Sequence, residues 1–83
     1  MDGSLSLGRT MREIRLKRRI RQKDMAEMLG VSKPYYCQVE RGNRRPSLKM
    51  VNDFMDKLDL SDGEVLRIAM RISRESKDGE RAD

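Results

Sequence analysis

The chain has 83 residues, of which 36% are hydrophobic and 40% charged, and its net charge is +5. This length suits one small domain, and strand-forming residues are too scarce and too irregular for a sheet, so we expect a small all-α core. Cys37 is the only cysteine and histidine is absent, which excludes a disulfide framework and a Cys/His metal set. We therefore expect no metal and no cofactor, and we interpret Cys37 as a small filler residue.

Positive charge is concentrated in the first half of the chain. Residues 7–49 contain 13 Lys/Arg and 4 Asp/Glu, a net of +9, whereas residues 50–83 contain 6 and 9, a net of −3. A basic segment of this kind is typical of a protein that binds a polyanion such as nucleic acid. No stretch is apolar enough to cross a bilayer or to form a signal-peptide core, so we expect a cytoplasmic protein without a membrane partner.

The spacing of apolar residues predicts five helices between two polar ends. We expect a flexible leader at 1–6 and a disordered charged tail at 74–83. The expected helices span about 7–18, 22–29, 33–41, 48–58 and 62–73. Capping signals support these bounds: Ser32, Ser47 and the Ser61/Glu64 capping box at helix starts, and Gly30 and Gly42 at helix ends.

The last two helices carry apolar stripes. The fourth helix presents Leu48, Val51, Phe54, Met55 and Leu58. The helix at 62–73 carries two stripes, Val65, Ala69 and Ile72 on one and Leu66 and Met70 on the other. We expect one stripe to pack on the core and the other to remain uncovered. In helix one, Leu16 lies off the buried stripe.

The segment from Gln22 to Gly42 has the register of a helix-turn-helix. Ala26 is small where two helices must approach most closely, and Gly30 lies where the first of them must end. Apolar residues occupy the other positions of the register: Met25, Leu29, Val31, Tyr36 and Val39. This pattern predicts two short helices joined at a steep angle, with the polar face of the second left free.

From Leu7 to Leu60 the chain resembles the XRE/Cro family of phage-repressor-like DNA-binding domains. The matching segments are LGRTMREIRLKR, QKDMAEMLGVS and YYCQVERGNRRPSL, and the VERG-x-x-x-PS ending is the most specific of them. The resemblance implies a compact five-helix, lambda-repressor-like fold for residues 7–73, with its helix-turn-helix at 22–41. The chain departs from the family pattern at Arg19, Arg21 and Pro34, where Gly, a Ser or Thr cap, and Ser are usual.

The resemblance also implies a DNA-binding site. The expected base-reading residues in the major groove are Lys33, Pro34, Tyr35 and Gln38. A Lys there donates to guanine O6 and N7 and a Gln pairs with adenine, whereas a Pro offers apolar contact alone. The residues expected at the DNA backbone are Gln22, Arg21, Lys23, Arg19, Ser32, Asn43, Arg44 and Arg45. Arg12 and Arg18 could extend these backbone contacts or could equally be plain surface. Arg15 and Glu40 are expected to form a structural ion pair.

The leading functional interpretation is a sequence-specific transcriptional regulator that binds a palindromic operator as a homodimer. One recognition helix, expected at 33–41, reads only about half a turn of major groove, so two copies are expected, with Leu66 and Met70 as the dimer surface. The alternatives are an antitoxin that binds both operator DNA and a toxin, or a restriction-modification controller protein. The chain has no histidine, no Gly-rich phosphate loop and no catalytic carboxylate cluster, so we do not expect an enzyme.

Overall fold

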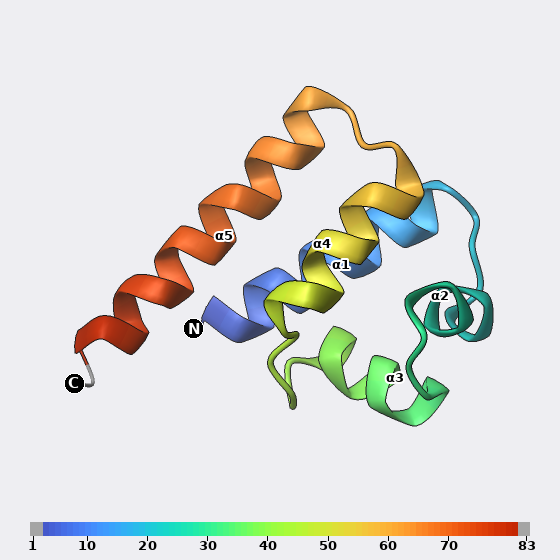
Figure 1. Cartoon of the computed structure of the whole chain (residues 1–83), viewed down its shortest axis with the longest axis horizontal. Coiled ribbons are helices and arrows are strands. Elements are labelled where there is room, and N and C mark those ends of the chain that lie inside the picture. The colour runs from blue at the N-terminus through green and yellow to red at the C-terminus, as the bar shows by residue number, and fades with distance from the viewer. Residues whose placement is uncertain (1–2, 82–83) are drawn as a thin grey trace.

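The computed structural model describes the backbone of residues 3–81 and the side chains of residues 7–73. In this part the chain forms helices and no strand, as the all-α prediction required. The helices are α1 (Gly3–Lys17), α2 (Gln22–Leu29), α3 (Lys33–Arg41), α4 (Leu48–Leu58) and α5 (Asp62–Arg81). α1 packs against both α3 and α5, and α2 packs against α3 and α4. α5 lies on the side of α1 away from α2 and α3 (Figure 1).

Serine side chains start two of the helices, as their capping signals predicted. The Ser32 Oγ accepts a hydrogen bond from the backbone N–H of Tyr35 at 3.2 Å, at the start of α3. The Ser47 Oγ accepts one from the N–H of Met50 at 3.1 Å, at the start of α4. Each bond satisfies an N–H that has no partner inside its helix, and each is worth about 1 kcal/mol.

Glycines end the two helices of the motif in the left-handed conformation. Gly30 has φ 71° and Gly42 has φ 84°. This reversal lets the next residue donate its N–H to a carbonyl of the last helical turn: Val31 to Ala26 and Asn43 to Gln38, both at 3.0 Å. The turn between α2 and α3 and the loop after α3 therefore begin in the same way, with a left-handed glycine at the end of the helix.

The helices at the two ends of the chain are longer than the sequence pattern predicted. α1 begins at Gly3 and α5 continues to Arg81, inside the segments expected to be a leader and a tail. The expected bounds at Leu7 and Ser73 were too short because they followed the apolar stripe alone. The sequence added to α5 contains Arg, Glu and Lys, which have good helix propensity, whereas the Gly and Ser residues added to α1 do not. None of the helices in the described range combines the length and the apolar content needed to span a membrane.

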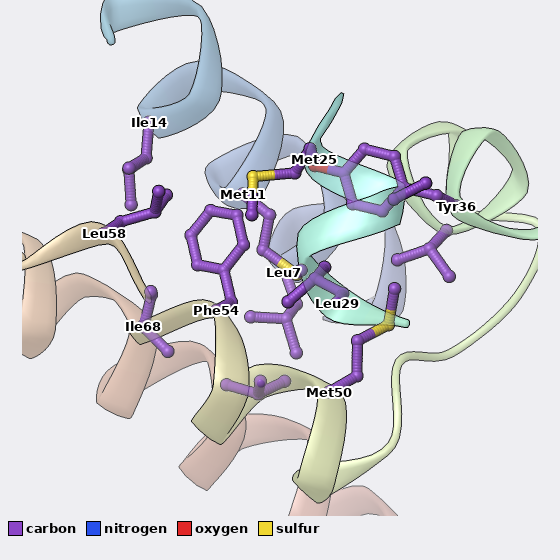
Figure 2. Close-up of a cluster of buried hydrophobic side chains, with 13 residues drawn as sticks. Leu7, Met11, Ile14, Met25, Leu29, Tyr36, Met50, Phe54, Leu58 and Ile68 are labelled. Carbon is purple, nitrogen blue, oxygen red and sulfur yellow. The ribbon is translucent and has the colours of Figure 1, made fainter. Parts of the chain in front are cut away.

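All five helices contribute side chains to one hydrophobic core (Figure 2). Phe54 and Tyr36 are its largest fully buried side chains. Burial of each such side chain stabilises the fold by roughly 1.5–3 kcal/mol. The buried hydrophobic residues are Leu7, Met11, Ile14, Met25, Ala26, Leu29, Tyr36, Val39, Met50, Val51, Phe54, Leu58 and Ile68.

Two of the predicted apolar stripes are placed differently in the structure. In α4, Leu48 is 66% exposed, and Met50 takes the buried position in the first turn. Met50 lies one turn before Phe54 and so shares its face, which Leu48 does not. In α5, Ile68 is buried, whereas Val65 is 40% exposed and Ala69 is also exposed. The expectation that one whole stripe of α5 packs on the core was therefore wrong for these two residues.

Gly8 sets the distance between α1 and α3. A Cβ atom at this position would overlap the carbonyl oxygen of Val39 in α3. Any side chain at residue 8 would therefore push the two helices apart, and the close approach of α1 to α3 depends on a glycine there. This contact fixes the position of α3 relative to the rest of the domain.

Candidate nucleic-acid interface

α3 divides its residues between the core and the surface. Tyr36 and Val39 are fully buried, whereas Lys33, Pro34 and Gln38 are exposed. Pro34 and Gln38 are four residues apart and so lie one above the other on the outer face of α3, with Lys33 in its first turn. Three of the four predicted base-reading residues thus point to solvent from one helix. The fourth, Tyr35, is half-buried.

The loop that follows α3 is tied to this helix. The backbone N–H groups of Asn43 and Arg44 donate to the carbonyl oxygen of Gln38 at 3.0 Å and 3.3 Å. The guanidinium carbon of Arg44 lies 5.3 Å from the centre of the Tyr35 ring, within the range of a cation–π contact. Residues 43–45 are exposed, while the next residue, Pro46, is buried. The structure therefore brings two predicted site residues, Tyr35 and Arg44, into direct contact.

Gln22, expected at a phosphate, is bonded within the protein at both ends of its amide. Its Nε2 donates to Glu40 Oε1 at 3.0 Å, and its Oε1 accepts from the Sγ of Cys37 at 3.1 Å. The side chain therefore links the start of α2 to α3. What remains for an external ligand is its backbone N–H, in the first turn of α2.

The other residues expected at the DNA backbone differ in their surroundings. Arg21 forms an exposed ion pair with Asp24, with Nε 2.8 Å from Oδ2. Lys23 is exposed, and Ser32 is committed to its helix cap. Arg19 is exposed and has φ 58°, a left-handed conformation that residues with a side chain seldom adopt. Arg19 occupies the position where the family usually has glycine, and the backbone keeps the conformation that glycine would favour.

The ion pair implied by the resemblance joins α1 to α3. Arg15 Nε lies 2.7 Å from Glu40 Oε2 and Nη2 lies 3.1 Å from Oε1, while Nη1 donates to the carbonyl of Ile20 at 2.6 Å. The two side chains are 6% and 1% exposed. Burial raises the pKa of the Glu40 carboxyl, but hydrogen bonds, chiefly from Arg15, outweigh burial and lower this pKa overall. Glu40 is therefore ionised and paired at neutral pH.

Tyr36 extends this buried polar cluster. Its hydroxyl group is buried and makes no hydrogen bond of ordinary geometry with the described residues. Burial, followed by the neighbouring Glu40, raises the pKa of Tyr36 far above its usual value, so the phenol stays neutral. The ring fills the core beneath α3, and this helix is thus held by both apolar and ionic contacts.

Sequence reasoning missed a second ion pair, which joins α1 to α5. Arg18 contacts both carboxylate oxygens of Glu64, at 2.9 Å and 2.8 Å, and its Nε donates to the carbonyl of Leu58 at 3.2 Å. Glu64 also accepts from the backbone N–H of Ser61 at 3.0 Å, which completes the predicted capping box. Arg18 lowers the pKa of Glu64 most, followed by this N–H, to about 2. Arg18 is therefore a structural residue, a role that no local pattern indicates.

No three His, Cys, Asp or Glu side chains among the described residues lie close enough to hold a metal ion.

A family model described as a helix-turn-helix domain matches residues 6–68. YazB of Bacillus subtilis, named as an uncharacterized HTH-type transcriptional regulator, is 36% identical over 58 residues, which cover 70% of this chain and 84% of that protein.

Solved structures share the fold. The restriction-modification controller protein C.AhdI from Aeromonas hydrophila has a TM-score of 0.65 and 30% identity, over 72% of this chain and 91% of that protein. The clp gene regulator ClgR from Corynebacterium glutamicum has a TM-score of 0.73 over 99% of this chain and 88% of that one, at 20% identity, and supports the fold alone. With the five-helix fold and the predicted family confirmed, the chain belongs to the helix-turn-helix domain family, in its XRE/Cro-like, phage-repressor-like group.

Proposed function

We propose that this protein is a sequence-specific transcriptional regulator that inserts α3 into the major groove of double-stranded DNA. The proposal rests on one observation: α3 is fixed to the core on one face and exposes polar side chains on the other. Its inner face is held by Tyr36, Val39 and the Glu40 ion pair, while its outer face presents Lys33 and Gln38 to solvent. The net charge of +9 over residues 7–49 supports a polyanionic partner.

The exposed residues divide naturally between base reading and backbone contact. Lys33 and Gln38 carry the donors that discriminate base edges, and Pro34 adds apolar contact. The guanidinium carbon of Arg44 lies 5.3 Å from the centre of the Tyr35 ring. This contact already restricts the Arg44 side chain, so less conformational entropy would be lost when it binds a phosphate. Arg19, Arg21, Lys23, Asn43 and Arg45 complete the backbone contacts, with Gln22 and Ser32 contributing through the first turns of α2 and α3.

A second copy of the chain completes the proposed regulator. On α5, Leu66 and Met70 are each 60% exposed and Val65 is 40% exposed, so an apolar face remains uncovered in the monomer. Two copies meeting along this face would present two α3 helices to successive major grooves, about 34 Å apart. We infer that the protein acts as a homodimer on a palindromic operator.

The likeness to C.AhdI favours one particular kind of regulator, a restriction-modification controller protein. That controller aligns over 91% of its length at 30% identity, so the two chains are comparable in both size and fold. The proposed DNA-binding surface is the same in either case, and the difference lies in which operator is bound. Selection of bound fragments from the source genome, followed by identification of the adjacent genes, separates a controller from a regulator of other genes.

Salt dependence tests the DNA-binding proposal directly. If five or six phosphates are contacted by each subunit, log K should fall with log[salt] at a slope of about −0.9 per phosphate. The measurement is the fluorescence anisotropy of a selected duplex at several salt concentrations. A flat response would exclude the proposed interface, since its affinity must come largely from counterion release.

A pair of variants tests which residues of the interface read bases and which contact phosphates. Lys33→Ala should relax sequence choice, with a cost of about 1–3 kcal/mol at one base pair, because it removes a base contact. Arg44→Ala should weaken binding to all duplexes similarly, because it removes a phosphate contact. Competition between cognate and scrambled duplexes distinguishes the two effects. Equal losses on both duplexes for Lys33→Ala would remove its base-reading role.

A further inference from the structure

Ion pairs join α1 to α5 at two points that are nearly one helical turn apart on α5. The guanidinium Nη1 and Nη2 of Arg18 lie 2.9 Å and 2.8 Å from the two carboxylate oxygens of Glu64. Lys17 Nζ lies 3.7 Å from Glu64 Oε2. At the second point, Arg67 Nη2 lies 2.6 Å from Glu13 Oε1. Charged side chains of α1 therefore hold α5 in two places.

Arg18 also holds the connection between α4 and α5. Its Nε donates to the carbonyl oxygen of Leu58 at 3.2 Å, and its Nη2 donates to that of Asp59 at 3.4 Å. Leu58 is the last residue of α4, and α5 begins soon after it, at Asp62. Because the guanidinium group is planar, its donors have fixed directions relative to one another. One side chain of α1 therefore fixes the direction in which the chain enters α5.

The apolar contacts of α5 define its orientation less closely than these ion pairs do. Among the α5 side chains that the structure describes, residues 62–73, Ile68 is the one apolar side chain that is fully buried, and Ile72 packs partly against the core. Apolar contact is non-directional, whereas an arginine that bonds both oxygens of a carboxylate has a defined geometry. The Arg18 and Glu64 side chains are 25% and 8% exposed, so solvent screens their interaction only in part.

The orientation of α5 matters because α1 lies between the proposed dimer face and the proposed DNA-reading helix. Gly8 and Arg15 fix α3 against α1, and the ion pairs fix α5 against α1. In the proposed dimer, a change in the angle between α1 and α5 would move α3 relative to the two-fold axis. Symmetry would apply the same change to the second copy. The separation and the relative rotation of the two α3 helices therefore depend on these ion pairs.

We propose that the ion pairs between α1 and α5 determine which half-site spacing the dimer accepts, with Arg18 and Glu64 as the principal positioning residues. The inference rests on the proposed function and adds to it a specificity determinant that touches neither base nor phosphate. One additional base pair moves two half-sites apart by about 3.4 Å and rotates one relative to the other by about 34°. A rigid dimer should reject such a site, whereas a dimer with a mobile α5 should tolerate it.

The test compares Glu64→Ala with Asp53→Ala on palindromes whose half-sites are moved one base pair closer together or further apart. Asp53 is a matched control, because its ion pair with Lys49, at 2.9 Å, lies within α4. Each variant removes one carboxylate and one ion pair. The spacing ratio is the affinity for the best spacing divided by that for its neighbours, so charge effects common to all duplexes cancel. Half-site affinity and circular dichroism show whether α3 and the helix content are retained.

The unmodified protein and Asp53→Ala should have spacing ratios of about tenfold or more, because a rigid dimer gains from the second half-site only where the spans match. Glu64→Ala should lower the ratio to about threefold or less and leave half-site affinity unchanged. If Glu64→Ala keeps the ratio of the unmodified protein, the inference is overturned while the proposed function stands. An unmodified protein that binds palindromes no more tightly than half-sites would reject the proposed homodimer, and the inference with it.

Exchanging the charges of Glu13 and Arg67 tests the same inference without altering the capping box of α5. Both side chains are about half exposed, so the core should be unaffected. Arg67→Glu should lower the spacing ratio by about twofold to fivefold, the range expected of an exposed pair, because two carboxylates would face each other. Adding Glu13→Arg should restore the ratio, a rescue that a loss of stability alone does not explain. An unchanged ratio in the single variant, or no recovery in the double variant, would overturn the inference even if Glu64→Ala does not fold.

Discussion

Arginines that are close together in α1 have different functions because of what each one contacts. Arg15 is 5% exposed and bonded to a buried carboxylate, whereas Arg12 is exposed and lines an open cleft between α1, α2 and α3. The same residue type thus forms a buried ion pair at one position and remains on the surface three residues away. Mutation should separate these roles, since the cost of losing a charge depends on what is left behind.

Arg15→Ala should destabilise the fold by on the order of 3 kcal/mol, because Glu40 would remain buried as an unpaired charge. Arg12→Ala, which removes an exposed side chain of the same helix, should cost less than about 1 kcal/mol. For a domain of this size, thermal unfolding should then show a difference of about 10 °C or more between the two variants. Equal melting temperatures would mean that the pair contributes nothing to stability.

Arg19 is expected to reduce stability and increase DNA affinity at the same time. Its left-handed φ of 58° is unfavourable for a residue with a Cβ, so Arg19→Gly should stabilise the fold by roughly 0.5–1 kcal/mol after the entropy of the unfolded glycine is subtracted. Affinity for all duplexes should fall, because a proposed backbone contact is lost. Urea unfolding and duplex titration of the same variant test both effects.

Asp59 provides the matched control for Arg19. It is also exposed and left-handed, with φ 50°, but it ends α4, outside the proposed interface. Asp59→Gly should stabilise the fold by a similar amount and leave duplex affinity unchanged or slightly higher. A loss of affinity common to both glycine variants would indicate a backbone effect and would remove Arg19 from the interface.

At the scale of helices, α1 connects α3 to α5. It meets α3 at Gly8 and through Arg15, and it meets α5 through Arg18 and Glu64. Glu64 has two functions there: it completes the capping box with Ser61 and accepts both bonds from Arg18. The attachment of α5 should therefore depend on the ionisation of one carboxyl group.

The pH dependence of stability follows from the lowered pKa of Glu64. Its ordinary value is 4.5 and its folded value is about 2, so the folded state favours the ionised form. This contribution is fully present above the unfolded pKa and is lost as pH falls from 4.5 towards 2. Glu64→Gln should therefore be less stable than the unmodified protein at pH 7, and the difference should shrink over this interval.

Urea unfolding at several pH values measures this difference. Glu27→Gln is the control, because Glu27 is exposed on α2 and has no ion pair within the described residues. Its difference from the unmodified protein should be small and should change little with pH. A Glu64→Gln penalty that stays constant down to about pH 2 would mean that its cause is lost packing and not lost charge.

At the scale of the whole molecule, the uncovered face of α5 is the main feature that one copy of the chain leaves unexplained. Leu66 and Met70 are exposed on the side of α5 opposite Ile68, which faces the core. Burial between two copies would remove this apolar surface from water, and DNA would strengthen a weak dimer by mass action. Dimerisation and tight operator binding should therefore depend on the same residues.

Leu66→Glu combined with Met70→Glu should give a folded monomer that binds a half-site normally but has lost tight binding to a full palindrome. The physical reason is that four carboxylates would face one another across the proposed two-fold axis. Sedimentation and titration with whole and half sites provide the measurements. A double variant that still binds a palindrome as two cooperating subunits would place the dimer interface elsewhere on the protein.

The sequence by itself determined the helices of the motif and their limits. α2, α3 and α4 have the predicted bounds because their signals act over a single turn: Ser32 and Ser47 bond residues three positions later, and Gly30 and Gly42 reverse the chain locally. The family pattern from Leu7 to Leu60 added the Arg15–Glu40 pair, which periodicity alone does not reveal. Features of this kind can be predicted from the sequence because the interacting groups are close in sequence or recur in a known register.

Only the tertiary structure decided which residues far apart in the sequence lie together. Arg18 meets Glu64 across 46 positions, and Arg9, Arg12 and Arg41 surround one cleft although they lie on two helices. The exposure of Val65 and Leu48 was also decided there, because an apolar residue is buried only if another helix covers its face. These outcomes depend on how complete helices pack against one another, which the pattern within any one helix does not specify.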